Sequence, residues 1–179
     1  MATNKQLETS NLKKTKRMVL TGLLFAIALV LSLVENSLPP LLIAVPGIKI
    51  GLSNIVVMYS LFFLGKKEAY MIAILKAGFV IIIRSPVSAF LSLVGGVLSI
   101  TIMLIFMLIF KEKISYLIIS IIGAVFHNIG QLIAISIVYT SIYILAYIPV
   151  LLISGVVAGA LTAVLLRLVL PAFNRLDLK

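Results

Sequence analysis

The chain has 179 residues, of which 63% are hydrophobic, and its 15 lysines and arginines against five aspartates and glutamates give a formal net charge of +10. This apolar share is far above the roughly 45–50% of soluble domains, so the composition excludes a soluble globular domain and predicts an integral membrane protein. The absence of cysteine and the single histidine exclude disulfides, a thiolate nucleophile and a multi-histidine metal site. We therefore expect no metal and no other cofactor.

The apolar runs predict an all-α bundle of six transmembrane helices over residues 18–170, in the lipid bilayer. A basic lead, residues 1–17, is predicted to be disordered or interfacial and cytoplasmic, and residues 171–179 form a cytoplasmic tail. The predicted spans are residues 18–38, 50–64, 69–83, 89–110, 114–139 and 148–170. The second and third are expected to form a hairpin around a tight charged turn. Residues 41–49 are too short to cross a membrane and are predicted to be a loop or re-entrant segment at the outer face.

The distribution of positive charge predicts the orientation. Twelve of the 15 lysines and arginines lie in the lead, in the two short turns at residues 65–68 and 111–113, or after residue 166. By the positive-inside rule both termini are cytoplasmic, in a multi-pass membrane protein. Because these residues flank apolar runs and lack interleaved aromatic rings, nucleic acid is not an expected partner. Six spans without a recognisable inverted repeat also suggest that transport would need a partner or an oligomer.

Charged residues within or beside the predicted spans are the first candidates for a site. Lys76 lies near the middle of the third span, where a charge costs at least about 2.5 to 3.5 kcal/mol on the insertion scale. It faces a ligand, or it snorkels or pairs with a carbonyl or Glu35. Lys49 and Arg84 lie at outer helix ends, where they either anchor the helices or, with Lys76, attract an anion such as a carboxylate or phosphate. Glu35 is expected to neutralise one cation or to belong to the lid.

A polar face in the fifth span is the second candidate. His127 and Gln131 are four residues apart and therefore share a face of the helix, with Asn128 beside them. They either contact a ligand or form the interhelical hydrogen bonds common in membranes. Asn54, in the second span, is a weaker member of the same set.

Small residues at helical spacing predict close contacts between helices. They are Gly22, Ala26 and Ala28 in the first span, Gly95 and Gly96 in the fourth, and Gly155 and Gly159 in the sixth. The sets in the first and sixth spans either pack within the bundle or, in the first span, meet another protein. Gly95 and Gly96 mark either a close approach or a local bend of the helix.

Motifs for catalysis are missing from the sequence. It has no Gly-rich phosphate loop, no HExxH and a single aspartate, Asp177 in the tail. His127 lacks a neighbouring nucleophile. The sequence therefore predicts a protein that is not an enzyme.

Three segments together resemble a known family: residues 46–54, the helix that carries Lys76 and ends at Arg84, and residues 123–131. They are similar to the bacterial family called Gx transporter or heptaprenyl diphosphate synthase component I, over most of the chain after about Lys16. That family in turn resembles the S components of energy-coupling factor transporters, six-helix proteins that bind small molecules from outside and dock on a coupling subunit with two ATPases. The resemblance implies that Gly22, Ala26 and Ala28 contact the coupling subunit and that residues 41–49 cover the ligand.

We therefore expect an S-component-like subunit that binds a small anionic or phosphate-bearing molecule and relies on partner ATPases for uptake. The expected ligand-binding residues are Lys49, Asn54, Lys76, Arg84, His127, Asn128 and Gln131. The alternative is a non-catalytic subunit associated with heptaprenyl diphosphate synthase in menaquinone biosynthesis, or with a quinone-linked electron-transfer assembly, with a prenyl synthase or a redox protein as partner. Prenyl synthases that do the chemistry use Asp-rich motifs, which this chain lacks. A third possibility is a membrane scaffold whose polar residues only pack helices.

Overall fold

The computed structural model describes residues 2–37, 52–111, 114–139, 146 and 148–175, and within these ranges all regular structure is helical. The six helices are α1 (Ala2–Ser37), α2 (Asn54–Phe63), α3 (Lys66–Ile83), α4 (Pro86–Phe110), α5 (Tyr116–Tyr139) and α6 (Ile148–Arg175). The prediction of an all-α fold is confirmed. The expected lid at residues 41–49, including Lys49, lies outside the described residues.

Four of these helices are long and apolar enough to cross a membrane: residues 11–35 of α1, all of α4 and α5, and residues 148–168 of α6. Helix α2 has ten residues and extends about 15 Å, half of a hydrocarbon core of about 30 Å. Helix α3 has 18 residues but carries four charged ones, Lys66, Lys67, Glu68 and Lys76. The fold is thus consistent with a multi-pass membrane protein, whereas the count of six spans stays a prediction.

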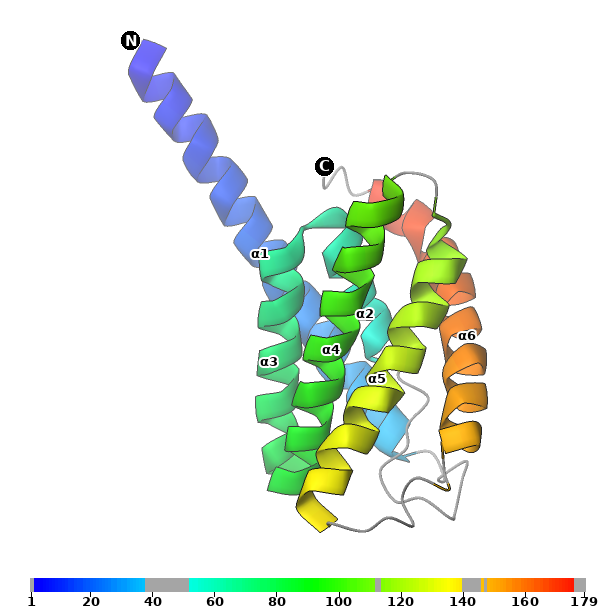
Figure 1. Cartoon of the computed structure of the whole chain (residues 1–179). Coiled ribbons are helices and arrows are strands. Elements are labelled where there is room, and N and C mark those ends of the chain that lie inside the picture. The colour runs from blue at the N-terminus through cyan, green and yellow to red at the C-terminus, as the bar shows by residue number, and fades with distance from the viewer. Residues whose placement is uncertain (1, 38–51, 112–113, 140–145, 147, 176–179) are drawn as a thin grey trace.

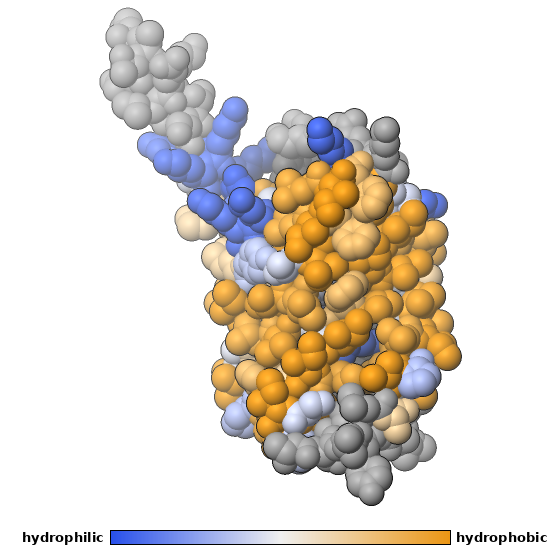
Figure 2. Space-filling view, in the orientation of Figure 1, coloured by the Kyte–Doolittle hydropathy of each residue, from blue (hydrophilic) through white to orange (hydrophobic). Residues whose placement is uncertain are grey.

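The helices form a bundle with two distinct ends (Figure 1). One end, here called the basic end, holds the turn between α2 and α3 and exposes Lys66 and Lys111; α6 also ends there. The opposite end, here called the pocket end, holds the end of α1 and the corner between α3 and α4. Large apolar side chains cover the sides of the bundle (Figure 2), as expected for a surface in contact with lipid. The core between the helices includes the fully buried Leu24, Ile72, Ile100 and Leu166.

Helix α1 begins earlier than predicted. Its polar first half extends the helix from the apolar span back to Ala2, and this half projects away from the bundle (Figure 1). Residues 2–17 contain neither proline nor glycine, so nothing in the sequence stops the helix from extending into the basic lead. The expectation of a disordered lead is therefore wrong in the described residues, and an interfacial position stays a prediction.

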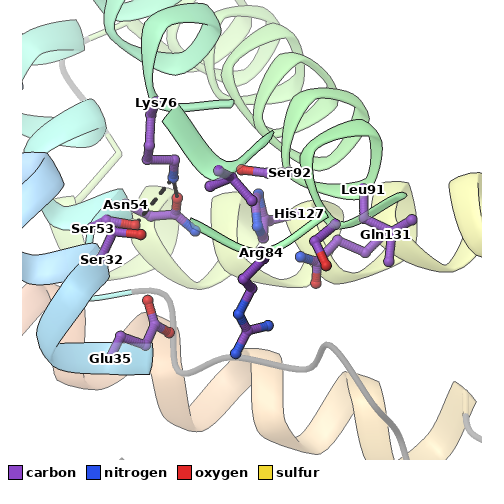
Figure 3. A pocket seen from close by; sticks show the side chains of 12 residues that line it. Ser32, Glu35, Ser53, Asn54, Lys76, Arg84, Leu91, Ser92, His127 and Gln131 are labelled. Carbon is purple, nitrogen blue, oxygen red and sulfur yellow. Dashed lines mark hydrogen bonds between the residues drawn. The ribbon is translucent and has the colours of Figure 1, made fainter. Parts of the chain in front are cut away.

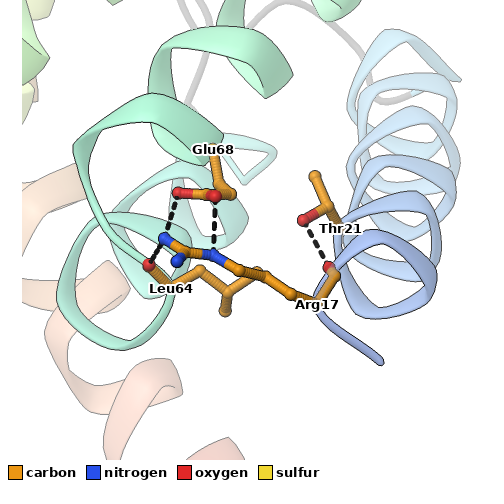
Figure 4. A network of polar contacts seen from close by, with 4 residues as sticks. All are labelled: Arg17, Thr21, Leu64 and Glu68. Carbon is orange, nitrogen blue, oxygen red and sulfur yellow. Dashed lines mark hydrogen bonds and ion pairs between the residues drawn. The ribbon is translucent and has the colours of Figure 1, made fainter. Parts of the chain in front are cut away.

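An ion pair joins α1 to the hairpin formed by α2 and α3 (Figure 4). Arg17 donates from Nε to Glu68 Oε1 at 2.6 Å and from Nη2 to Glu68 Oε2 at 2.8 Å, and Nη2 also donates to the Leu64 carbonyl. This two-pronged geometry fixes orientation better than a single contact. The hairpin turn itself depends on Gly65, whose φ of 123° is rarely adopted by residues with a side chain. The predicted hairpin is confirmed, and the charged residues after Gly65 form the first turn of α3.

Glycines set the closest helix crossings. A Cβ atom on Gly159 of α6 would lie 2.5 Å from Cα of Ile121 in α5, and one on Gly155 would lie 3.0 Å from Cα of Val125. A Cβ on Gly95 of α4 would lie 2.8 Å from the carbonyl oxygen of His127. The predicted close contacts at these three glycines are confirmed, because a side chain there would collide with the neighbouring backbone.

The small-residue face expected on the first span needs a correction. Gly22 and Ala26 are exposed, and a Cβ on Gly22 would meet nothing within 4 Å, but Ala28 is fully buried in the core. Six residues at about 100° each turn Ala28 roughly 240° away from Gly22. Ala28 therefore packs inside the bundle and is not available to a partner, whereas the partner contact of Gly22 and Ala26 stays a prediction.

Candidate ligand-binding pocket

A polar pocket opens between five helices at the pocket end (Figure 3). Its empty volume, including the open space at its mouth, is about 440 Å³. Six residues singled out from the sequence line it: Glu35 from α1, Asn54 from α2, Lys76 and Arg84 from α3 and its end, and His127 and Gln131 from α5. The fold thus brings together residues that lie up to 96 positions apart in the sequence.

Lys76 is the most deeply placed cation of this pocket, with 4% of its surface exposed. It lies on the buried face of α3, together with the core residues Ile72, Ala73 and Val80. Its Nζ donates hydrogen bonds to Asn54 Oδ1 at 2.7 Å and to Ser53 Oγ at 3.2 Å (Figure 3). Both of these acceptors are neutral, so they position the ammonium group without removing its charge. The side chain stays within the bundle and does not snorkel along the lipid-facing surface.

Arg84 and Glu35 bring the other formal charges of the described lining. Arg84 follows the last residue of α3 and is exposed, whereas Glu35 is 7% exposed near the end of α1. With Lys76, the described lining has two cations and one carboxylate. A pocket with this excess of positive charge and neutral hydroxyl and amide groups favours an anion over a cation.

The polar face of α5 enters the pocket because α4 has a glycine opposite it. His127 and Gln131 are both buried, and both are close to Gly95: a Cβ there would lie 3.0 Å from His127 Cε1 and 3.0 Å from Gln131 Cγ. The imidazole of His127 and the Cγ methylene of Gln131 therefore lie so close that a side chain at position 95 would displace them. This confirms that the two side chains share a face, as their spacing predicts.

Asn128 does not line this pocket. Its Nδ2 donates to the carbonyl oxygen of Leu151 at 2.9 Å and to Ser154 Oγ at 3.2 Å, both on α6. Asn128 is rotated about 100° from His127 around α5, which directs it to the neighbouring helix. Its observed contacts are those of an interhelical hydrogen bond.

We expect the substitution Asn128→Leu to lower the free energy of unfolding by about 0.6 to 2 kcal/mol, because two hydrogen bonds between α5 and α6 are lost. Thermal unfolding of the detergent-solubilised protein measures this, with Asn11→Leu on the exposed lead as the matched control. An unfolding midpoint as high as that of Asn11→Leu would contradict the packing role.

Four serines of the lining were not predicted from the sequence: Ser32, Ser53, Ser88 and Ser92. Ser88 and Ser92 are four residues apart on α4, and Ser32 lies three residues before Glu35 on α1. This helical spacing indicates that each of these serines shares a helix face with another polar residue. That signal is weak, because serines inside apolar helices commonly bond to their own backbone. Ser136 and Thr162 do so here, each donating to the carbonyl four residues earlier.

The described part of the chain contains no group of three or more His, Cys, Asp or Glu that would hold a metal ion. The pocket instead offers one ammonium, one guanidinium, one carboxylate, hydroxyl groups, two amides and an imidazole. These groups can bind an anion by charge and by directed hydrogen bonds.

A family model for heptaprenyl diphosphate synthase component I matches residues 24–169, which is most of the chain. The chain belongs to this family. Comparisons with curated proteins and with solved structures find no match. The resemblance stated from the sequence motifs is thereby confirmed for component I of heptaprenyl diphosphate synthase, while the likeness to energy-coupling factor S components stays a proposal.

Proposed function

We propose that this member of the component I family is a non-catalytic membrane subunit that works with a prenyl synthase and binds a phosphate-bearing anion in the polar pocket. The family description supports the partner. The sequence supports the non-catalytic role, since its single aspartate cannot form the Asp-rich motifs of a prenyl synthase. Uptake driven by partner ATPases, which the sequence led us to expect, becomes the second candidate function.

The observation that carries the ligand is the position of Lys76. Lys76 has 4% of its surface exposed within an apolar bundle, where a charge is costly, and it lines a cavity together with Arg84, Glu35 and several hydroxyl groups. Binding of an anion in this cavity would give the charge a functional role. Phosphate oxygens accept hydrogen bonds from ammonium, guanidinium and hydroxyl groups together. A diphosphate carries enough negative charge to bind both cations of the lining, although Glu35 adds one carboxylate there.

The orientation follows from the distribution of lysine and arginine. We place the basic end in the cytoplasm, both termini with it, and all six helices across or within the membrane. A soluble synthase component would then dock on the basic end, where Lys13, Lys14 and Lys16 are exposed on α1. The pocket end would face the other side of the membrane.

The position of the pocket at the end of the bundle opposite the basic end favours a second candidate, an S-component-like subunit for uptake. A pocket that opens opposite the cytoplasmic termini can accept a molecule from outside, and α1 exposes Gly22 and Ala26 toward a possible coupling subunit. In that case ATPases would supply the energy, because this chain has no nucleotide-binding motif.

Purification of the tagged protein from its own host, in mild detergent, separates the two candidates. Mass spectrometry should identify a prenyl synthase as the enriched partner, relative to an unrelated tagged multi-pass protein from the same membrane. Enrichment of a coupling subunit with two ATPases would overturn the synthase partner in favour of the second candidate. If no prenyl synthase is enriched and calorimetry detects no binding of inorganic diphosphate, the proposed function is wrong.

A further inference from the structure

The basic end carries a group of lysines that is separate from the polar pocket. Lys13 and Lys14 are exposed on the lead half of α1, and Lys66 and Lys67 are exposed in the first turn of α3. Hydrophilic side chains gather where the lead leaves the bundle, directly beside the apolar sides of the helices (Figure 2). These four lysines are here called the lysine surface.

The ion pair between α1 and α3 brings the two halves of the lysine surface together. Arg17 binds Glu68 in the first turn of α3, with distances of 2.6 and 2.8 Å to the two carboxylate oxygens. Lys13 lies four residues before Arg17 and therefore on the same face of α1, one turn farther out. Lys67 directly precedes Glu68. The lysines of both helices thus lie beside one fixed contact.

The lysine surface has an excess of positive charge. Among the residues whose side chains the structure describes, Glu68 is the one carboxylate at the basic end, and Arg17 binds both of its oxygens. The four lysines therefore add four positive charges beside a pair that is already neutral. Clusters of four or more basic residues next to a transmembrane helix attract the phosphate headgroups of anionic lipids.

The lysines lie at the level of a membrane headgroup layer. The apolar span of α1 begins at Met18, so Lys13 and Lys14 lie about 6 to 7.5 Å beyond it along the helix. The headgroup layer on one side of a bilayer is about 5 to 7.5 Å thick. Leu12 and Val19 are 66% and 65% exposed and, seven residues apart, share a face of α1. A lipid surface offers phosphate and hydrocarbon within this distance, which favours lipid over an acidic protein as the partner.

We propose that the lysine surface binds the phosphate headgroups of anionic phospholipids. The lead projects away from the bundle (Figure 1), so the headgroups would occupy the angle between the lead and α3 and hold the lead at the membrane surface. The proposal does not rest on the proposed function, because none of the four lysines lines the polar pocket. Lys111, at the end of α4, stays available to a soluble protein that docks on the basic end.

The first test compares the binding of phosphatidylglycerol, which is anionic, and phosphatidylcholine, which is neutral overall, to the detergent-solubilised protein by native mass spectrometry. We expect the unmodified protein to bind phosphatidylglycerol at least about fivefold more tightly. Replacing the four lysines of the lysine surface together by glutamine should reduce this preference to less than about twofold. Replacing the same four by arginine keeps the charge and is the matched control, which should retain the preference.

The second test reports where the lead lies relative to a membrane. Because the chain has no cysteine, Thr15→Cys provides a single labelling position on the exposed lead for a nitroxide. The protein is placed in nanodiscs of phosphatidylcholine, with or without about 30% phosphatidylglycerol. We expect phosphatidylglycerol to lower the accessibility of the label to a water-soluble relaxation agent by at least about twofold.

Several outcomes would overturn the lipid site. They are equal binding of the two lipids by the unmodified protein, a full preference in the glutamine variant, and a lost preference in the arginine variant. Unchanged accessibility of the label would overturn it too, and would leave the lysine surface to an acidic protein. If the glutamine variant does not fold, the unmodified protein and the labelled variant still decide. Diphosphate binding at the pocket end is measured separately, so this proposal and the proposed function can fail independently.

Discussion

Replacing Lys76 by methionine is expected to weaken the binding of inorganic diphosphate by about 10-fold to 100-fold. Methionine keeps most of the length of the side chain but removes the ammonium group that Ser53 and Asn54 orient. A hydrogen bond to a charged group contributes about 1.5 to 3 kcal/mol, and the loss of this one interaction sets the range. Titration calorimetry in nanodiscs measures the change directly.

The control for this variant is Lys66→Met, at the start of the same helix. Lys66 is exposed at the basic end and does not line the pocket, so its loss changes the net charge equally without touching the site. We expect it to leave the affinity within about twofold. An equal loss of affinity in the two variants would mean that diphosphate binding depends only on the overall charge of the protein. Unchanged affinity in both variants would show that Lys76 does not contact the anion.

The substitution Gly159→Ala is expected to destabilise the bundle by about 1 to 3 kcal/mol. The added Cβ would lie 2.5 Å from Cα of Ile121 and 2.9 Å from the Ser120 carbonyl oxygen. These are backbone atoms, so α5 and α6 must move apart, and the hydrogen bond from Ser120 Oγ to Gly159 O is strained with them. Thermal unfolding in a fixed detergent should report a lower midpoint.

Gly22→Ala and Gly78→Ala are the matched controls for this prediction. Both glycines lie within helices, and a Cβ at either one would meet nothing within 4 Å. We expect the same chemical change to be neutral there, or stabilising by up to about 1 kcal/mol, because alanine favours the helix. A similar loss of stability in all three variants would contradict close backbone contact as the cause.

How far the sequence predicts the site can be judged from single residues. Helical spacing was enough to place His127 and Gln131 on one face of α5, and the cost of a charge in an apolar span was enough to select Lys76. The same spacing could not tell that Asn128 bonds to α6 or that Ala28 is fully buried. Those outcomes depend on how each helix is rotated against its neighbours.

By itself, the sequence determined that this protein is helical, apolar enough for a membrane, basic at one end, and a member of the component I family. Composition, helical periodicity and local motifs fix these properties within short stretches of chain. Only the tertiary structure decided that Asn54, Lys76 and His127, from three separate helices, meet at one pocket. The physical reason is that contacts between helices depend on packing among residues far apart in the sequence, including glycines that let one backbone approach another.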